Sequence, residues 1–170
     1  MTSTRRTGSS AEPGAEGNKS GYDTAIAKAR RLCASREYCI SEIRAKIEEW
    51  ALVPPQKSDE IIASLVSDRF IDEQRYASAF ARDKLRYNKW GRIKISYALR
   101  MKDLPANVIA GALNGIDEQE YLLIASKLVE RILKTKKKSD AGLLRASVVR
   151  SMQSKGFETA VIMKLLHGKN

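Results

Sequence analysis

The sequence predicts an all-α protein made of three tandem three-helix repeats, helix-turn-helix-like units arranged in an elongated, slightly curved body. Apolar residues recur at three- and four-residue steps, and the two-residue alternation typical of strands is absent. The apolar pattern itself repeats: Leu52, Leu104 and Phe157 hold equivalent positions, 52 and then 53 residues apart. A period of this length built from helices indicates an array of small modules, which suits an extended partner.

We expect three groups of helices. The first group covers 23–34, 40–51 and 58–68, the second 73–88, 92–102 and 105–113, and the third 118–135, 140–155 and 158–167. The expected domains are a disordered tail over 1–21, an acidic repeat over 22–71, and two basic repeats over 72–116 and 117–170. The tail is predicted because that segment is rich in Ser, Thr, Gly and Glu and has no apolar core.

Residues that begin or end helices support these bounds. Asp72 and Pro105 suit helix starts, and the spacing of Asp117 and Glu120 matches a capping box. Gly156 lies where a helix end favours a left-handed residue.

Charge is distributed unevenly along a chain whose net charge is +11. Residues 37–73 carry a net charge of −5, whereas residues 74–104 and 131–155 each carry +7. A solvated surface does not require this asymmetry, which therefore favours a polyanionic partner for the basic repeats and a second contact for the acidic one.

The helix expected over 73–88 concentrates this charge. Arg75, Arg82, Arg86 and Lys89 lie within an arc of about 60° at 100° per residue. The opposite, core-facing side is predicted to hold Tyr76, Phe80 and Tyr87, with Lys84 extending outward past them.

The candidate contacts to DNA or a protein partner are the cations of the basic repeats: Arg75, Arg82, Lys84, Arg86, Lys89, Arg92, Lys94, Arg100, Lys102, Lys136, Lys137, Lys138, Arg145 and Arg150. Gly91 is expected to free the backbone for a sharp bend before the next helix. Trp50 and Trp90 are either base-stacking platforms or, more commonly in helical modules, packing anchors.

Several classes of function are disfavoured. Cys33 and Cys39 lie far from the single histidine, His167, so no metal site is expected and free thiols are predicted. Neither a catalytic triad nor a Gly-rich phosphate loop is present, so we expect no cofactor and no enzymatic activity. No stretch reaches the ~18 apolar residues of a membrane span. A cytoplasmic monomer without a membrane partner is expected.

Three stretches resemble a known family: Phe70-Ile71-Asp72-Glu73-Gln74-Arg75-Tyr76-Ala77-Ser78-Ala79-Phe80, then Trp90-Gly91-Arg92-Ile93-Lys94-Ile95 with Leu99, and Ser41-Glu42-Ile43-Arg44 with Ile47. The chain is similar over 22–170 to RecX, the bacterial regulatory proteins that modulate the recombinase RecA. It departs from the family pattern at Asp103, where glycine is usual and the helix end is expected to close differently. Further departures are Cys39 at a helix cap and the inserted Pro54-Pro55.

The resemblance implies a non-enzymatic protein that binds the RecA filament near its DNA. It implies inhibition of the RecA ATPase, strand exchange and filament growth in recombination, DNA repair and the SOS response. Single- and double-stranded DNA alone would be bound weakly and in a salt-sensitive way. The alternative is a sequence-selective DNA-binding or transcription-regulating helical protein, although short apolar third helices such as 107–113 offer little that can read a base edge.

Overall fold

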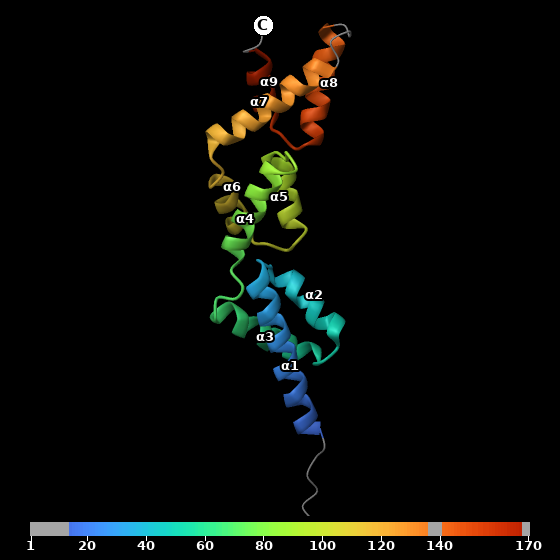
Figure 1. The fold of residues 1–170 in the computed structure, drawn as a ribbon, viewed down its shortest axis with the longest axis vertical. Helices are drawn as coiled ribbons and strands as arrows, with labels where there is room; N and C mark the ends of the chain where they lie inside the picture. The colour runs from blue at the N-terminus through green and yellow to red at the C-terminus, as the bar shows by residue number, and fades with distance from the viewer. Residues whose placement is uncertain (1–13, 136–140, 168–170) are drawn as a thin grey trace, which may run out of the picture. The chain divides into compact units, whose positions relative to one another are not determined.

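The computed structural model describes residues 14–135 and 141–167, and within these ranges it contains nine helices and no strands (Figure 1). The helices are α1 (Gly14–Ser35), α2 (Ile40–Trp50), α3 (Pro55–Ser67), α4 (Glu73–Arg86), α5 (Arg92–Arg100), α6 (Ala106–Asn114), α7 (Glu118–Thr135), α8 (Ala141–Ser154) and α9 (Thr159–His167). The all-α class is confirmed. In this part of the chain, every helix is too short or too polar to cross a membrane.

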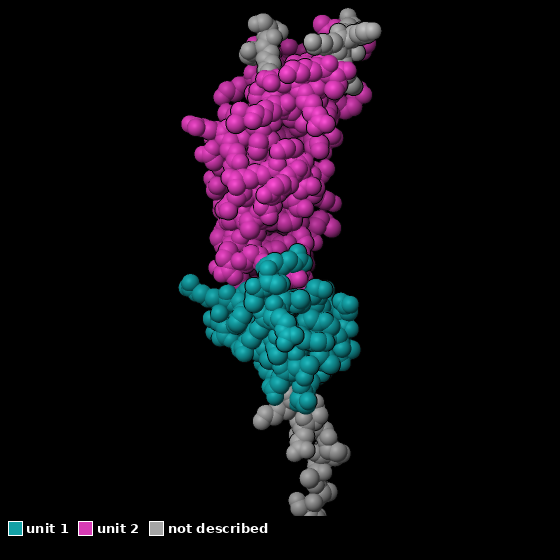
Figure 2. Space-filling model, in the orientation of Figure 1, with its two compact units in different colours: residues 1–36, 43–70 teal, residues 37–42, 71–170 magenta. Residues whose placement is uncertain are grey.

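The described residues form two compact units, coloured teal and magenta in Figure 2. The first unit holds α1, α3 and α2 from Ile43 onward. The second unit holds α4–α9 together with the short segment Glu37–Glu42, which includes the first turn of α2.

The prediction of a disordered tail is wrong for residues 14–21, which form the first turns of α1. The sequence signal is weak there because these residues lack an apolar period, but extending a helix costs far less than nucleating one. Within the first unit, Gly21 also lies directly against the turn that follows α2: a Cβ at this position would come 2.2 Å from the carbonyl oxygen of Leu52. Residues 1–13 lie outside the described part of the chain.

The inserted prolines of the first unit lengthen a helix. Pro54 is the N-cap of α3, with φ −66° and ψ 157°, and Pro55 is its first residue, so α3 begins three residues earlier than predicted. Proline suits this position because the first N–H of a helix has no intrahelical partner and the fixed φ is already helical.

In the second unit, α4–α9 share one hydrophobic core. The first helix of each repeat here contributes a buried tyrosine, Tyr76 in α4 and Tyr121 in α7. Phe157 is 1% exposed, and its ring centroid lies 5.3 Å from that of Tyr121. Because each large apolar side chain stabilises the fold by roughly 1.5–3 kcal/mol when fully buried, the second and third repeats stabilise one another.

The three repeats share a backbone conformation as well as a pattern of apolar residues. The second helix of each repeat is followed by a residue with positive φ: Ala51 (50°), Asp103 (61°) and Gly156 (84°), each immediately before the equivalent residues Leu52, Leu104 and Phe157. The expectation that Asp103 would close its helix differently is therefore wrong. Aspartate tolerates the left-handed region better than most residues, so the turn keeps the geometry that glycine would adopt.

The expected caps are confirmed where side chains accept backbone hydrogen bonds. Asp72 accepts from the N–H of Arg75 at 2.9 Å, and Asp117 accepts from the N–H of Glu120 at 2.7 Å. Helix α4 ends at Arg86, and its C-cap Tyr87 keeps helical dihedrals, with φ −94° and ψ −43°. That side chain is 80% exposed, and its predicted place in the core is wrong.

The second and third repeats meet at two glycines. Gly91 donates to the carbonyl of Lys155 at 2.8 Å, and Ile93 donates to the carbonyl of Gly156 at 3.0 Å. Gly91 has φ −81°, which any residue adopts, so the prediction that it is needed for a sharp bend is wrong. It is needed because a Cβ there would lie 2.2 Å from the Gly156 oxygen.

We predict that Gly91→Ala or Gly156→Ala lowers the free energy of unfolding by about 2 kcal/mol or more. An alanine at Gly156 would add left-handed strain and bring its Cβ to 2.5 Å from the Lys94 backbone nitrogen. Urea denaturation followed by circular dichroism measures the decrease. Gly115→Ala is the matched control, because its φ is −76° and its nearest neighbour would lie at 3.5 Å. Equal stability for all three variants would contradict the role of this contact.

Candidate nucleic-acid and protein interface

Four of the predicted cations already have carboxylate partners within the second unit. Arg75 pairs with Glu37, Lys102 with Glu42 and Arg92 with Glu118, each at 2.6 Å, and Arg86 pairs with Glu120 at 2.7 Å. These pairs join residues 26 to 60 positions apart in the sequence, so no local pattern predicts them. The positive charge available to a partner is therefore smaller than the sequence suggests.

The pair of Lys102 and Glu42 is the most sheltered of these ion pairs. Burial by itself would raise the pKa of Glu42, but several groups together lower it, and the hydrogen bond and charge of Lys102 are the largest of these contributions. The backbone N–H of Cys39 and the Tyr76 hydroxyl also lower it, the hydroxyl donating to Glu42 at 3.2 Å. Within the described residues, Oε2 of Glu42 is buried without a hydrogen-bond donor. Lys102 is therefore a structural residue.

Arg92 joins the second repeat to the third. Its guanidinium stacks over the Tyr121 ring, 4.1 Å from the centroid, and pairs with Glu118 and, at 3.5 Å, with Glu158. The Tyr121 hydroxyl donates to Glu158 and accepts from the Arg92 N–H at 3.2 Å. Burial, followed by the bond to Glu158, raises the pKa of Tyr121. Arg92 is therefore part of the contact that joins the second repeat to the third.

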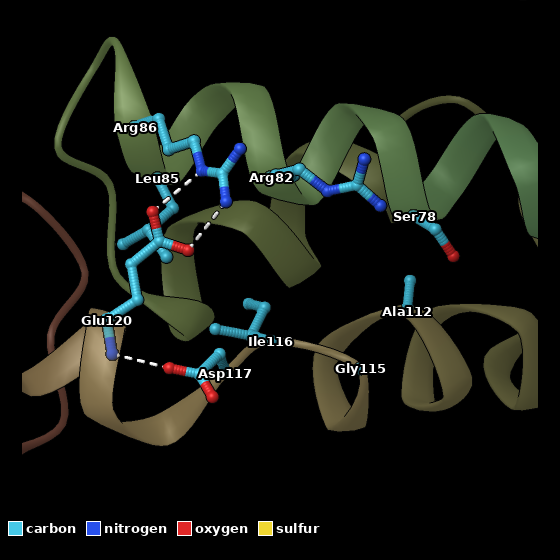
Figure 3. Close-up of a pocket in the computed structure, with 9 residues that line it drawn as sticks. All are labelled: Ser78, Arg82, Leu85, Arg86, Ala112, Gly115, Ile116, Asp117 and Glu120. Carbon is cyan, nitrogen blue, oxygen red and sulfur yellow. Dashed lines mark hydrogen bonds and ion pairs between the residues drawn. The ribbon is translucent and has the colours of Figure 1, made fainter.

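A pocket of about 340 Å³ lies between α4, the end of α6 and the start of α7 (Figure 3). Leu85, Ala112 and Ile116 line its apolar part. On one side Arg86 and Glu120 form a two-bond ion pair, which lowers the pKa of the carboxyl. In Figure 3 the guanidinium of Arg82 lies apart from this pair. The two arginines face two carboxylates, Glu120 and Asp117, so the pocket is no concentrated phosphate site.

Another set of predicted cations forms no ion pair within the described residues, although the charges of Arg82 and Lys89 help to lower the pKa of Glu120. Arg82, Arg145 and Arg150 make neither a hydrogen bond nor an ion pair there. Arg100 bonds only to Ser96 of its own helix, at 3.0 Å, and Lys89 donates to the backbone carbonyl of Arg86. These five residues, which we call the unpaired cations, retain their charge for a partner.

Lys84 and Lys94 have a third kind of environment. Their ammonium groups lie 5.1 and 5.0 Å from the Trp90 ring centroid, and Lys94 also donates to the Ser154 carbonyl at 3.3 Å. Trp90 is half-buried and packs against the core of the second unit, which favours the packing role over base stacking. Lys136, Lys137 and Lys138 lie outside the described residues.

Nothing in the described ranges groups three or more potential metal ligands. The described residues thus combine tandem three-helix repeats with a set of unpaired cations. Residues 72–113, which include most of α4–α6, match the family model described as RecX, second three-helix domain.

The most informative relative is Regulatory protein RecX of Acinetobacter baylyi, 30% identical over 138 residues, covering 80% of this chain and 82% of the relative. Regulatory protein RecX of Geobacillus thermodenitrificans is 25% identical and is covered over 55% of its length. The chain belongs to the RecX family of regulatory proteins. The fold agrees with the crystal structure of RecX from Lactobacillus salivarius, with a TM-score of 0.81 at 17% identity, covering 88% of this chain and 97% of that one.

We predict that Lys102→Met lowers the free energy of unfolding by about 2 kcal/mol at pH 7, because it leaves the Glu42 carboxylate buried without its cation. In the wild type, the lowered pKa means that the pair stabilises the fold above pH 4.5 and that this contribution disappears as the pH falls further. In the variant, burial dominates and raises the pKa of Glu42, so protonation of this carboxyl favours the folded state, and part of the stability lost at pH 7 should be regained as the pH falls towards 4.5. Urea denaturation between pH 7 and pH 3 measures both effects.

The control is Lys57→Met, which breaks the exposed pair of Lys57 and Glu60. Exposed pairs contribute about 0–1 kcal/mol, so its unfolding curve should stay close to that of the wild type at every pH. If the free energies of unfolding of the Lys102→Met and Lys57→Met variants depended on pH in the same way, the titration of Glu42 would not depend on Lys102.

Proposed function

We propose that this protein binds the RecA filament on DNA and inhibits the RecA ATPase, strand exchange and filament growth, in recombination, DNA repair and the SOS response. Membership of the RecX family supports a regulatory role. In this proposal the protein acts as a cytoplasmic monomer, without catalysis of its own, and binds single- and double-stranded DNA alone only weakly. The acidic first repeat contacts a region of the filament different from that contacted by the basic repeats.

The observation that carries the proposal is the set of unpaired cations on helices that share one core. Arg82 on α4, Arg100 on α5 and Arg150 on α8 belong to the same compact unit. The shared core and the contact of Gly91 with Gly156 hold these helices together. Fixed cations that form no ion pair favour phosphate contacts, because no internal ion pair must break when DNA binds.

Sequence-selective reading of duplex DNA receives little support. A recognition helix needs polar side chains that reach base edges in the major groove. Helix α6 has the sequence ANVIAGALN, and its exposed positions include Asn107, Ala110 and Gly111 but no cation. Its role in the structure is to pack against α4 and α5.

The proposal is tested by titrating the protein into RecA that hydrolyses ATP on single-stranded DNA. We expect inhibition at ratios below one molecule per RecA subunit, because a regulator bound to a filament affects several neighbouring subunits. An unchanged hydrolysis rate up to equimolar protein would reject the proposed function. Tight, sequence-selective binding to duplex DNA without RecA would support the alternative.

We predict that Arg82→Glu combined with Arg100→Glu weakens inhibition of RecA by at least about tenfold. It should also reduce the slope of log affinity against log salt for single-stranded DNA by about 0.7 for each phosphate that the variant no longer binds. Neither arginine forms an ion pair within the described residues, so the far-ultraviolet circular dichroism should remain that of the wild type. Arg75 and Arg86 are less suitable, because reversing them would break ion pairs.

The matched control is Arg31→Glu combined with Lys46→Glu, which changes the net charge equally but in the first unit. If this control weakens DNA binding and inhibition to the same extent, net charge alone is responsible and the unpaired cations have no special role.

A further inference from the structure

Helix α5 carries an apolar stripe on the side away from the core. Ile93, Tyr97 and Met101 are 57%, 64% and 68% exposed. They follow one another at four-residue steps, and residues so spaced share one face of a helix. Met101, the C-cap of α5, keeps helical dihedrals with φ −65°, so the stripe runs along about 12 Å of helix.

The stripe is not a by-product of core packing. The opposite side of α5 supplies Ile95 and Leu99, both fully buried, and the helix packs there against α4 and α6. Single exposed apolar residues are ordinary on protein surfaces, but a contiguous row is typical of an interaction site.

The chemistry of the stripe favours a protein over a nucleic acid as the contact. Base stacking needs flat aromatic rings, and only Tyr97 of the three has one. Aliphatic and thioether side chains at this spacing are typical of a helix that lies in the hydrophobic groove of a partner. The stripe therefore points to a groove on a folded protein.

The charges beside the stripe restrict that groove further. Helix α5 contains no acidic residue, and Arg100 lies next to the stripe with Ser96 as its one side-chain hydrogen-bond partner among the described residues. An acidic rim on the partner would complement it. A surface that joins an apolar stripe to unpaired cations fits a partner that is part protein and part polyanion.

We infer that the stripe of α5 docks into an acidic-rimmed apolar groove of the protein subunits of a nucleoprotein filament, while the unpaired cations contact its nucleic acid. This inference rests on the proposed function, which identifies the filament as RecA on DNA. It assigns the two components of the filament to different side chains of the same compact unit.

The test compares the wild type with a variant in which Ile93→Gln, Tyr97→Gln and Met101→Gln are combined. Two measurements are made: inhibition of RecA ATP hydrolysis on single-stranded DNA, and affinity of the protein alone for a fluorescein-labelled single strand. We expect the half-inhibitory concentration to rise at least about tenfold, while the affinity for DNA alone changes less than about twofold. Glutamine is a good helix former, so circular dichroism and thermal unfolding should match the wild type.

The matched control combines Val66→Gln and Leu123→Gln, which remove exposed apolar side chains from α3 and α7. It should inhibit RecA as the wild type does. Equally weakened inhibition by the control and the stripe variant would show that the effect is not specific to α5 and would overturn the inference.

The remaining outcomes separate the two proposals. If the wild type inhibits RecA and the stripe variant inhibits it equally well, or if DNA affinity falls in parallel with inhibition, the stripe does not dock on protein and only this inference fails. If light scattering shows a wild-type dimer that the variant converts to a monomer, the occupant is a second copy and the inference also fails. A wild type without effect on RecA rejects the proposed function and this inference together.

Discussion

The close contact of two backbones at Gly91 and Gly156 is the constraint on which the second unit depends. It brings the start of α5 onto the turn between α8 and α9, where any Cβ would prevent the two hydrogen bonds. Once that approach is made, Tyr121 and Phe157 lie in contact, and Arg92 reaches Glu118 and Glu158. The repeats are thereby joined through their main chains, and side-chain packing and ion pairs reinforce the joint.

The ion pairs of the second unit reduce the positive charge that is available to a partner. The basic repeats contain many cations, but Arg75, Arg86, Arg92 and Lys102 are neutralised by carboxylates that stabilise the second unit. The unpaired cations form a smaller set, placed on helices with a common core. Under the proposed function this division matters, because the charges proposed to bind the filament are not the charges that hold the protein together.

The turn after the second helix of each repeat was only partly predictable from the sequence. The apolar residues Leu52, Leu104 and Phe157 reveal the period, and the structure adds a left-handed residue before each of them. Only Gly156 indicates that conformation by its residue type, since Ala51 and Asp103 are not glycine. The helix bounds at Pro55, Arg86 and Gly14 differed from those predicted because each depends on tertiary contact or on helix extension, which leave little local pattern.

The all-α class, the three repeats, the caps at Asp72 and Asp117, the family and the two basic regions can be predicted from the amino-acid sequence, because they depend on spacing over a few turns of helix or on composition. The partners of the cations, the need for glycine at position 91, and the exposure of Ile93, Tyr97 and Met101 become visible only in the folded protein. The difference lies in the range of the interactions. Capping and helical periodicity act between near neighbours, whereas ion pairs such as Lys102 with Glu42 join residues 60 positions apart.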